Sequence, residues 1–513
     1  MSTLDFILFT LFGVLVIGLG LWIGYRKRKQ DSHEFFLAGN SLPWWAVGGA
    51  LIASNISAEQ FIGMTGTGYT VGMAVASYEL MAAASLIFIA FIFIPFFLHH
   101  RIYTMPQFLE IRYNKQVKTA LAFYWVILFV FVNISSVLYL GSLAIEKMGI
   151  SKEWAILILI LYSSATSIWG GLTAVVWTEV AQLLILLIGG LAVTYFSVAN
   201  IQGNFLSSLA FLYEKFPSHF DLILSSEHPK YSDFPGWGMV FGGIWIANLY
   251  YWGMNQYIIQ RALGAQNLYQ AQKGIMFAAW VKLLMPLIVV LPGIAMFYHQ
   301  PNLKNPDDAY PLLMENFLPI GIKGLAFAAL TAAVGSSISA MVNSASTIFT
   351  LDIYKVLFNP KSSENQLVKV GKIASTLALL IGAFIAPSIG LFGQAAFIYI
   401  QKYTGYLSPA VVVLFLWGIL WKKASAFAAN IVVLIAIPLS IFLDFFFKDL
   451  PFIHQMGISF VVLSAVMIGL SFYKNKNQVD PQSLEFVQNL PKNLVLHAFG
   501  ILGILTFIYY FFG

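Results

Sequence analysis

The 513-residue chain is 59% hydrophobic and 16% aromatic, carries charge on only 10% of its residues and has a net charge of +6. Soluble domains carry charge on about 25% of their residues, so this composition excludes a soluble globular protein and predicts an integral membrane protein. The chain contains no cysteine, which excludes disulfides, thiolate metal sites and a cysteine nucleophile.

Fourteen apolar segments are long enough to cross a bilayer. In chain order they are 5–25, 43–66, 74–99, 117–145, 153–170, 175–200, 236–259, 272–298, 320–350, 368–388, 394–420, 424–444, 451–472 and 494–512. The first segment lacks a basic start and ends in four basic residues, an order opposite to that of a cleavable signal peptide, so we expect it to be retained. No Walker loop interrupts the chain, which argues against an ATP-driven pump.

The basic residues predict how the chain is oriented. With the N-terminus outside, nineteen Lys and Arg residues fall in cytoplasmic loops and seven in outer loops. We therefore expect a multi-pass protein of the plasma (inner) membrane with both termini on the extracytoplasmic side. This assignment places Lys282 and Lys402 inside membrane spans and every arginine in a loop.

Two of the spans are interrupted by polar residues, at 53–60 in the second span and at 247–256 in the seventh. Each interruption is either a loop between two short helices or unwound backbone that lines a cavity. Interrupted helices five spans apart are typical of secondary transporters built from inverted repeats. We therefore predict a single all-α transporter domain, 1–513, in which 43–200 and 236–420 are the repeats. An extra helix, 5–25, precedes them, and extra helices follow at 424–512.

Ionisable residues inside membrane spans are functional candidates because their desolvation must be offset. An acid and a base that cancel each other, surrounded by amides, suit a neutral solute with several hydroxyl groups. The absence of an arginine from the spans argues against an acidic solute. The alternative is that Glu79 and Lys282 only pair and hold two helices together. The ionisable candidates are Glu59, Glu79, Glu179, Lys282 and Lys402, and the amide candidates are Gln60, Asn248 and Gln401.

A second candidate site is the small-residue stretch 332–337 in the ninth span, which ends in Ser336 and Ser337. Small residues allow close helix packing, and packing alone would explain the stretch. Two serines beside a broken helix also offer hydroxyl oxygens next to free backbone carbonyls, the all-oxygen shell that a hard cation such as sodium prefers. The carbonyls would come from Ala53, Ile56 and Ala333.

Long segments of the chain resemble the sodium/solute symporter family, and the likeness covers nearly the whole sequence. They are 36–48, 55–64, 170–178, 248–261 and 343–354. The resemblance implies a leucine-transporter fold with five-plus-five inverted repeats. It also implies a sugar site, an inner gate, a sodium site and a residue for sodium release. These map onto Gln60, Glu79, Asn248, Lys282 and Gln401 for sugar, Asn55 and Tyr251 for the gate, Ala53, Ile56, Ala333, Ser336 and Ser337 for sodium, and Glu179 for sodium release.

Two residues depart from the family's pattern. Ala82 stands where a sugar-contacting serine is expected, and Glu179 stands where an aspartate is usual. The first departure removes a hydroxyl partner for the solute and leaves the preferred sugar open. The second keeps the charge and lengthens the side chain by one methylene.

The resulting prediction is a sodium-coupled symporter that imports a neutral monosaccharide, galactose or glucose, by alternating access. Sodium, the sugar and the lipid bilayer are the expected partners, and no nucleic acid is expected. The alternative is a sodium- or proton-coupled symporter of another polar solute, such as myo-inositol or a sialic acid. A channel, a membrane-embedded sensor and an enzyme are disfavoured, because the chain has no soluble output domain and no nucleophile–base set in its spans.

Overall fold

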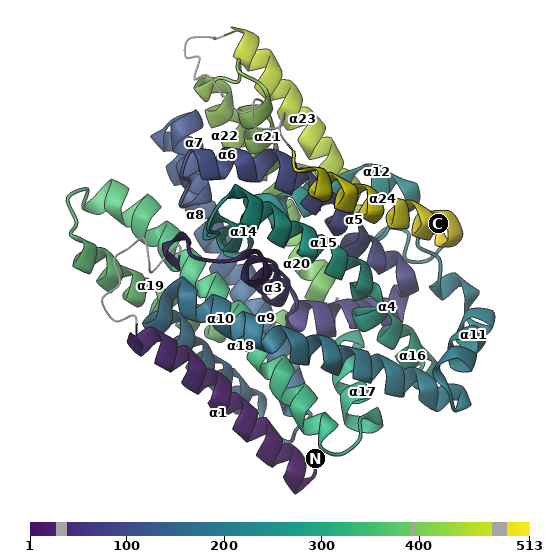
Figure 1. Ribbon diagram of the computed structural model, residues 1–513. Helices are drawn as coiled ribbons and strands as arrows, with labels where there is room; N and C mark the ends of the chain where they lie inside the picture. Colours follow the sequence, from purple (N-terminus) through teal and green to yellow (C-terminus); the bar gives the residue numbers. More distant parts are fainter. Residues whose placement is uncertain (27–37, 391–395, 474–489) are drawn as a thin grey trace.

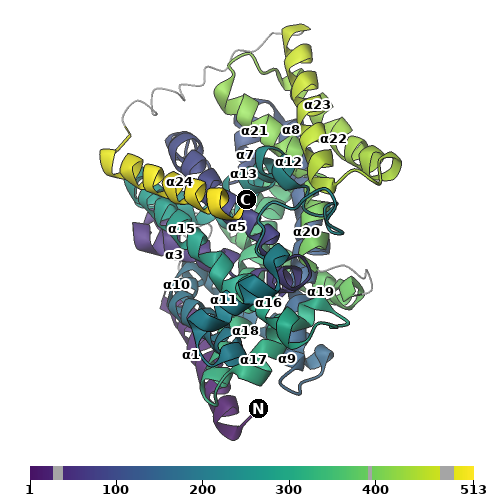
Figure 2. The same ribbon diagram turned by 90° about the vertical axis from the view of Figure 1, so that its right-hand side faces the viewer.

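The computed structural model describes residues 1–26, 38–390, 396–473 and 490–513. Within these residues the chain is helical, and one isolated backbone bridge joins Leu42 to Ala265. Helices α1 and α24 lie on the outside of the molecule, and α3 lies near its centre (Figures 1 and 2). The predicted all-α fold class is confirmed.

Ten helical stretches in the described residues are each long and apolar enough to cross a bilayer. The first is α1 (Thr3–Arg26), and the second runs from η2 (Glu59–Met64) through α4 (Thr65–Val71), η3 (Gly72–Val75), α5 (Ala76–Phe88) and η4 (Ile89–Phe93) to α6 (Ile94–His99). The third consists of α8 (Lys115–Leu128), η5 (Phe129–Ile134) and α9 (Ser135–Glu146). The fourth is the second part of α10 (Lys152–Gln202), and the fifth consists of α15 (Leu268–Val289) and α16 (Leu291–His299). The other five are α18 (Ile322–Ile348) with η9 (Phe349–Phe358), α19 (Glu364–Ile389), α22 (Ala426–Phe446), α23 (Phe452–Tyr473) and α24 (Lys492–Phe512). The pair α20 (Ala396–Gly405) and α21 (Ser408–Leu420), bent by 53°, forms an eleventh span.

The other three predicted segments also fall on helices. Segment 43–66 begins with α3 (Trp44–Asn55), and segment 153–170 is the first part of α10. Segment 236–259 is divided among α12 (Gly236–Phe241), α13 (Gly243–Leu249), η7 (Tyr250–Met254) and α14 (Gln256–Leu263). Within the described residues all fourteen predicted segments are thus helical, and the helix is broken in both of the spans predicted to be interrupted.

Helix α3 ends at the predicted interruption. Its last residue is Asn55, the next residue, Ile56, has φ −73° and ψ 82°, and helical structure resumes in the π-helical turn η2. Non-helical backbone at membrane depth is tolerated only where protein or a cavity surrounds it, and every residue from Ala53 to Gln60 is buried. The interruption is therefore a broken helix inside the protein.

The second interruption lies at Asn255, whose φ of −87° and ψ of 118° are extended. It separates the π-helical turn η7 from α14. A further break occurs at Gly242, between α12 and α13, where φ and ψ are both −117°. The seventh span is therefore broken within the predicted range and also at a position that was not predicted.

Helix α10 is one unbroken helical run of 51 residues, yet its two parts fold back on each other. Gln182 Nε2 donates a hydrogen bond of 2.8 Å to Tyr162 Oη. Twenty residues of straight helix would separate these side chains by about 30 Å. The chain therefore reverses direction between them, and α10 contains the two spans predicted at 153–170 and 175–200.

The N-terminal helix is fastened to α18 through a buried carboxylate. Asp5 Oδ1 accepts hydrogen bonds from the backbone N–H groups of Gly321, at 2.7 Å, and Gly324, at 3.0 Å. These N–H groups belong to the start of α18 and have no partner within that helix, so a carboxylate satisfies them. Asp5 thereby positions the start of the helix that carries Ser336 and Ser337.

Short helices fill the connections. The segment 201–235 contains α11 (Phe205–Lys215) and η6 (Pro217–His219). The others are η1 (Ala38–Asn40), α7 (Met105–Arg112), η8 (Pro306–Asp308) and α17 (Ala309–Phe317).

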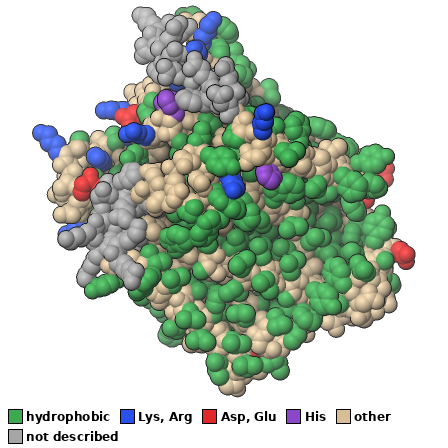
Figure 3. Space-filling model, in the orientation of Figure 1, with side chains coloured by type: hydrophobic (Ala, Val, Ile, Leu, Met, Phe, Trp, Pro, Cys, Tyr) green, Lys and Arg blue, Asp and Glu red, His purple; other side chains and the backbone are tan. Residues whose placement is uncertain are grey.

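Basic side chains and chain termini lie on different sides of the molecule. In Figure 1, α1 and α24 both slope toward the lower right, where their terminal ends lie. In Figure 3, which has the same orientation, Lys and Arg side chains gather toward the upper left, and hydrophobic side chains cover the area between. A broad apolar band with basic residues at one end is the surface expected of a protein that spans a membrane.

Helices α3 and α15 cross at two glycines. A Cβ atom on Gly48 would lie 2.5 Å from the carbonyl oxygen of Gly274 and 2.7 Å from a ring carbon of Phe277. A Cβ atom on Gly274 would lie 2.7 Å from the carbonyl oxygen of Trp44. The two backbones approach this closely only because neither glycine carries a side chain.

We predict that Gly48→Ala lowers the free energy of unfolding by about 1–3 kcal/mol, because the added methyl group overpacks the crossing of α3 and α15. The measurement is the thermal unfolding midpoint of the detergent-purified protein. Gly13→Ala in α1 is the matched control, since no atom lies within 4 Å of the position that a Cβ atom would take there. Equal midpoints for Gly48→Ala and the unsubstituted protein would contradict the prediction.

Candidate functional site

A buried cavity lies where the two broken spans meet α5 and α20. Its volume is about 30 Å³, room for roughly one water molecule. Pockets that enclose a small organic ligand usually measure about 300–1,000 Å³, so a monosaccharide would fit only after the walls move apart. The cavity is lined by Asn55, Glu59, Gln60, Met64, Tyr78, Glu79, Ala82, Ala247, Asn248, Tyr251, Trp252, Phe397 and Gln401.

A buried ion pair stands beside this cavity. Lys282 Nζ donates to Glu79 Oε2 and also to Asn55 Oδ1, and it lies 4.9 Å from the ring centroid of Trp252. The side chain of Lys282 is 0% exposed and that of Glu79 is 3% exposed, so each charge depends on the other to offset its desolvation. The two residues thus form the pair that was considered as an alternative to a binding role. It draws together α5, α15 and the broken end of α3.

Tyrosine hydroxyls cover one side of the cavity. Asn55 Nδ2 donates to Tyr251 Oη at 3.0 Å, and Tyr257 Oη donates to the same oxygen at 2.9 Å. The rings of Tyr251 and Tyr257 meet edge to face, with centroids 5.9 Å apart. Asn55 therefore joins the ion pair to this tyrosine layer, since its oxygen accepts from Lys282 and its nitrogen donates to Tyr251.

Aromatic rings cover another side of the cavity. Tyr78 meets Phe397 edge to face with ring centroids 5.2 Å apart, and it meets Phe234 with centroids 6.3 Å apart. Gln60 Oε1 is buried near these rings and has no hydrogen-bond partner among the described residues. A buried unpaired carbonyl costs free energy, so Gln60 is disposed to accept a hydrogen bond from a hydroxyl group brought into the cavity.

The break in α3 releases the carbonyl groups of Ala53 and Ile56. In a continuous helix they would accept from the N–H groups of Ser57 and Gln60, four residues later. Here Ser57 N–H bonds to Asn55 O at 2.8 Å, and Gln60 N–H bonds to Ser57 O at 3.1 Å. Both carbonyls thus lose their helical hydrogen bonds and retain full acceptor capacity in a buried place.

The serine pair of α18 lies against this break. Ser337 Oγ donates to the carbonyl oxygen of Ser54 at 3.2 Å, and Ser337 is 0% exposed. Ser336 Oγ is buried and has no hydrogen-bond partner among the described residues. The structure therefore brings together the two predicted serines and the released end of α3, and the orphaned hydroxyl of Ser336 fits an oxygen shell for a hard cation.

A second buried ion pair lies behind the break. Arg261 Nη2 donates to Glu179 Oε1 at 2.6 Å, and Arg261 Nε donates to Glu179 Oε2 at 3.3 Å. The hydroxyl oxygen of Ser54 lies 2.8 Å from Glu179 Oε1, and the third nitrogen of Arg261 donates to the carbonyl oxygen of Tyr257. This cluster ties α10 to both broken spans through Ser54 and Tyr257.

The sequence placed every arginine in a loop, whereas two arginines are buried in short helices. Arg261 lies in α14 and is 0% exposed, and Arg112 lies in α7 and is 4% exposed, where its guanidinium donates to backbone carbonyls. Arg261 follows the second break and precedes basic Lys273, so the charge pattern assigned it to a cytoplasmic loop. The signal that pointed to its burial was Glu179, an acid in the sixth span for which the sequence offered no partner.

The predicted site residues separate into three groups in the structure. Gln60, Glu79, Asn248, Gln401, Asn55 and Tyr251 line the cavity together. Lys282 stands behind that lining, held by Glu79 and Asn55. Ala53, Ile56, Ala333, Ser336 and Ser337 are buried at the contact of α3 with α18, and Glu179 stands beyond Ser54.

Other buried polar groups were not predicted. Tyr78, Trp252 and Tyr257 contribute directly to the walls or to the tyrosine layer around the cavity.

Lys402, predicted to lie inside a span, pairs with Asp444 at 2.7 Å, and both side chains are more than a quarter exposed. It is therefore distinct from the buried pair at Lys282.

The chain is similar in sequence to known proteins. The model of the sodium:solute symporter family matches residues 35–436. A sodium/glucose cotransporter of Vibrio parahaemolyticus is 44% identical and covers 99% of this chain and 98% of its own. A sodium/myo-inositol cotransporter 2 of Sus scrofa is 33% identical over 91% of this chain and 76% of its own.

A solved structure, of the substrate-bound outward-open state of a Na⁺-coupled sialic acid symporter, has the same fold. The TM-score is 0.83 at 22% sequence identity, and the match covers 93% of this chain and 100% of that one. The fold predicted from the sequence, the leucine-transporter fold with extra helices, is confirmed.

We predict that Glu179→Gln and Arg261→Met each lower the free energy of unfolding by about 3–5 kcal/mol, because each leaves the other charge buried without a partner. The double variant should lose less than the sum of the two single losses. The measurement is a double-mutant cycle of unfolding in detergent.

The matched control is Lys402→Gln, which breaks the partly exposed pair with Asp444 and should cost less than about 1 kcal/mol. Strict additivity of the Glu179 and Arg261 effects would show that the two residues do not act as a pair.

Proposed function

This chain belongs to the sodium:solute symporter family, and we propose that it imports a neutral monosaccharide, galactose or glucose, driven by inward movement of sodium. The observation that carries the proposal is the double role of the break in α3. Ser337 of α18 donates to the carbonyl oxygen of Ser54 at this break, while Asn55 and Gln60, on the same stretch, line the cavity.

The chemistry of the cavity favours a neutral solute. Glu79 and Lys282 cancel each other's charge, and the amides of Gln60, Asn248 and Gln401 add donors and acceptors suited to hydroxyl groups. Arg261 does not line the cavity, and its guanidinium is engaged by Glu179. The cavity therefore offers no free cation for the carboxylate of a sialic acid.

The sugar would bind between the two aromatic sides of the cavity. Gln60 and the Glu79 carboxylate would accept hydrogen bonds from its hydroxyl groups, and Asn248 and Gln401 would donate to its oxygens. Lys282 would orient Glu79 and exchange one of its bonds for a sugar oxygen. The ring of Tyr251 would stack on the apolar face of the sugar and close the path toward Tyr257.

Sodium would bind where α3 meets α18. The carbonyls of Ala53, Ile56 and Ala333 and the hydroxyls of Ser336 and Ser337 supply the oxygen ligands that this ion prefers. Bound sodium would hold the broken end of α3 against α18 and so fix Asn55 beside Lys282 and Tyr251. Sodium stabilises the sugar-binding state only through its higher affinity for that state.

Release would reverse these steps on the cytoplasmic side. Sodium would leave past Glu179, whose carboxylate is 2.8 Å from the hydroxyl of Ser54, one residue beyond Ala53. Loss of the ion frees the end of α3, so Asn55 no longer holds Tyr251 in place. The orientation with both termini outside suits this sequence of steps, because Lys and Arg side chains gather on a different side of the molecule from the termini (Figure 3).

A different solute is the second candidate. The relative from Sus scrofa is a myo-inositol cotransporter, and myo-inositol also presents a ring of hydroxyl groups. Ala82, in the wall of the cavity, offers no hydroxyl at a position where a serine is expected. A relative that is 44% identical in sequence is a sodium/glucose cotransporter, which favours a monosaccharide as the solute.

Uptake into proteoliposomes tests the proposed function. We expect an inward sodium gradient to drive accumulation of labelled galactose or glucose above that of myo-inositol and sialic acid. A potassium gradient, or a pH gradient without sodium, should not support accumulation. Preferred uptake of myo-inositol would replace the proposed substrate, and uptake driven by pH alone would replace the proposed ion.

Two substitutions should separate the sodium and sugar sites. Ser336→Ala removes one oxygen ligand, so it should raise the half-saturating sodium concentration by about tenfold, the equivalent of one hydrogen bond. Gln401→Ala should raise the apparent KM for sugar by a similar factor at saturating sodium and leave the sodium dependence unchanged. Both constants are measured from initial uptake rates.

The controls are Ser346→Ala, whose hydroxyl bonds within α18 to the carbonyl of Asn343, and Gln300→Ala, whose side chain is exposed. Both should transport like the unsubstituted protein. Loss of sodium affinity in Gln401→Ala would assign this glutamine to the ion site.

A further inference from the structure

An apolar groove opens between α11, α15 and α24, and it shares no lining residue with the solute cavity. Its volume is 680 Å³, within the range of pockets that hold small molecules. Among the described residues that line it, only Tyr213 has a polar side chain. The groove is lined by Met73, Leu80, Leu206, Leu209, Ala210, Tyr213, Phe220, Leu222, Leu283, Pro286, Leu287, Leu291, Ile508, Phe511 and Phe512.

The groove is continuous with the surface that faces lipid. Leu287 lines it and is 45% exposed, and the neighbouring Leu284 on α15 is also exposed. Thr194 of α10 donates to the carbonyl of Leu287 at 2.9 Å, which places the exposed Leu191, one turn earlier on α10, beside the same opening. Hydrocarbon of the bilayer therefore has direct access to the groove.

The outer end of the groove lies near the level of lipid headgroups. Trp237 stacks on Phe241, and its ring centroid is 6.2 Å from that of Tyr509 on α24. Trp237 is exposed, and exposed Trp side chains are enriched at the interface between hydrocarbon and water. Exposed Glu214 and Lys215 end α11 next to the groove, so the charged end of an amphiphile could stay in water.

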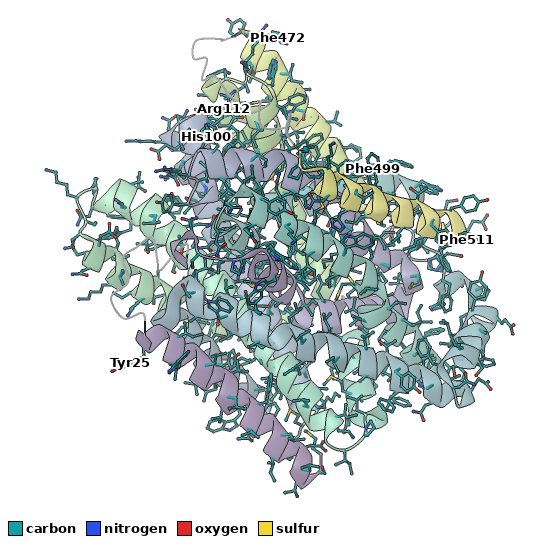
Figure 4. The ribbon with its side chains drawn as sticks, viewed as in Figure 1. Tyr25, His100, Arg112, Phe472, Phe499 and Phe511 are labelled. Carbon is teal, nitrogen blue, oxygen red and sulfur yellow. The ribbon has the colours of Figure 1, made fainter. Side chains whose placement is uncertain are left out.

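The walls of the groove belong to separate parts of the chain and are fastened together at one end. Leu222 N–H donates to the carbonyl oxygen of Phe512 at 2.7 Å, which joins the outer loop to the C-terminal helix. Phe511 projects from the same end of α24, and Phe499 marks its other half (Figure 4). The groove is thus a built space between three elements and not a shallow surface patch.

We propose that this groove binds one acyl chain of a membrane phospholipid. Each methylene buried there contributes about 0.8 kcal/mol, and the bilayer supplies such chains at high local concentration. The chain lies against Pro286, whose ring removes the backbone N–H that would bond to the carbonyl of Lys282. It thereby fills space behind the turn of α15 that carries Lys282 into the ion pair with Glu79.

Photolabelling of the full-length protein in vesicles tests the proposal. The probe is a phosphatidylcholine with a diazirine in its acyl chain, varied from about 1% to 10% of the vesicle lipid, and labelled peptides are mapped by mass spectrometry. Peptides of α11 and α24 should reach saturation, whereas the exposed face of α10 should be labelled in proportion to the probe. Proportional labelling of both regions would mean that bulk lipid only passes by, and would overturn the proposal.

Filling the groove supplies the matched variants. Ala210→Trp and Leu206→Trp change exposed residues of α11 and should reduce saturable labelling at least fivefold. Ile188→Trp adds the same bulk to the exposed face of α10 and should leave labelling of α11 and α24 unchanged. Equal labelling in Ala210→Trp and the unsubstituted protein would overturn the proposal.

A stability measurement tests lipid binding independently of photolabelling, in case a variant is labelled poorly for a reason other than loss of the bound acyl chain. Phosphatidylcholine added to delipidated protein in detergent should raise the thermal unfolding midpoint of the unsubstituted protein and of Ile188→Trp. It should have little effect on Ala210→Trp, whose new side chain occupies the groove. An equal rise in all three proteins would count against a chain bound at this place. Neither measurement depends on the identity of the transported solute.

Discussion

The ammonium group of Lys282 is the interaction on which the centre of this protein depends. It is fully buried, it pairs with Glu79, and it donates to Asn55 at the broken end of α3. A buried charge without partners would be very costly, so α5, α15 and α3 must stay together wherever this lysine is charged. Within the pair the two charges cancel, and the cavity lining also includes Glu59. A single desolvated cation thus sets both the packing of three helices and the kind of solute that the cavity suits.

The second buried pair, Glu179 with Arg261, imposes a similar demand on the other side of the break. Ser54 is within reach of Glu179, and Arg261 also holds the carbonyl of Tyr257. The end of α3 therefore lies between two ion pairs, one at the cavity and one behind the serine pair of α18. A stretch of chain held at both ends by charge pairs has few allowed positions, which is the property required of a coupling element with discrete states.

Much of this architecture could be predicted from the sequence because polar residues are conspicuous among apolar ones. Ser54, Asn55 and Gln60 interrupt a hydrophobic run, and the break follows at that place. The sequence also offered Glu79 and Lys282 as a possible pair, because both are ionisable residues of opposite charge inside predicted spans. The burial of Arg261 could not be predicted, because its local sequence is that of a helix end near a basic loop, and only the folded chain brings Glu179 beside it. The roles in binding sugar and sodium stay predictions, since residue types and contacts define what a site can bind and not what it transports.

The crossing of Gly48 and Gly274 also restricts how sequences of this fold can change over time. Each glycine is confronted by backbone of the opposite helix, and backbone cannot be replaced by a smaller residue to make room. A compensating second substitution is therefore not available at the contact, and the helices would have to separate instead. Separation would pull Lys282 on α15 away from Asn55 on α3. Single substitutions at these two positions are therefore not tolerated one after the other. The crossing stays constant, while the side chains around it are free to change.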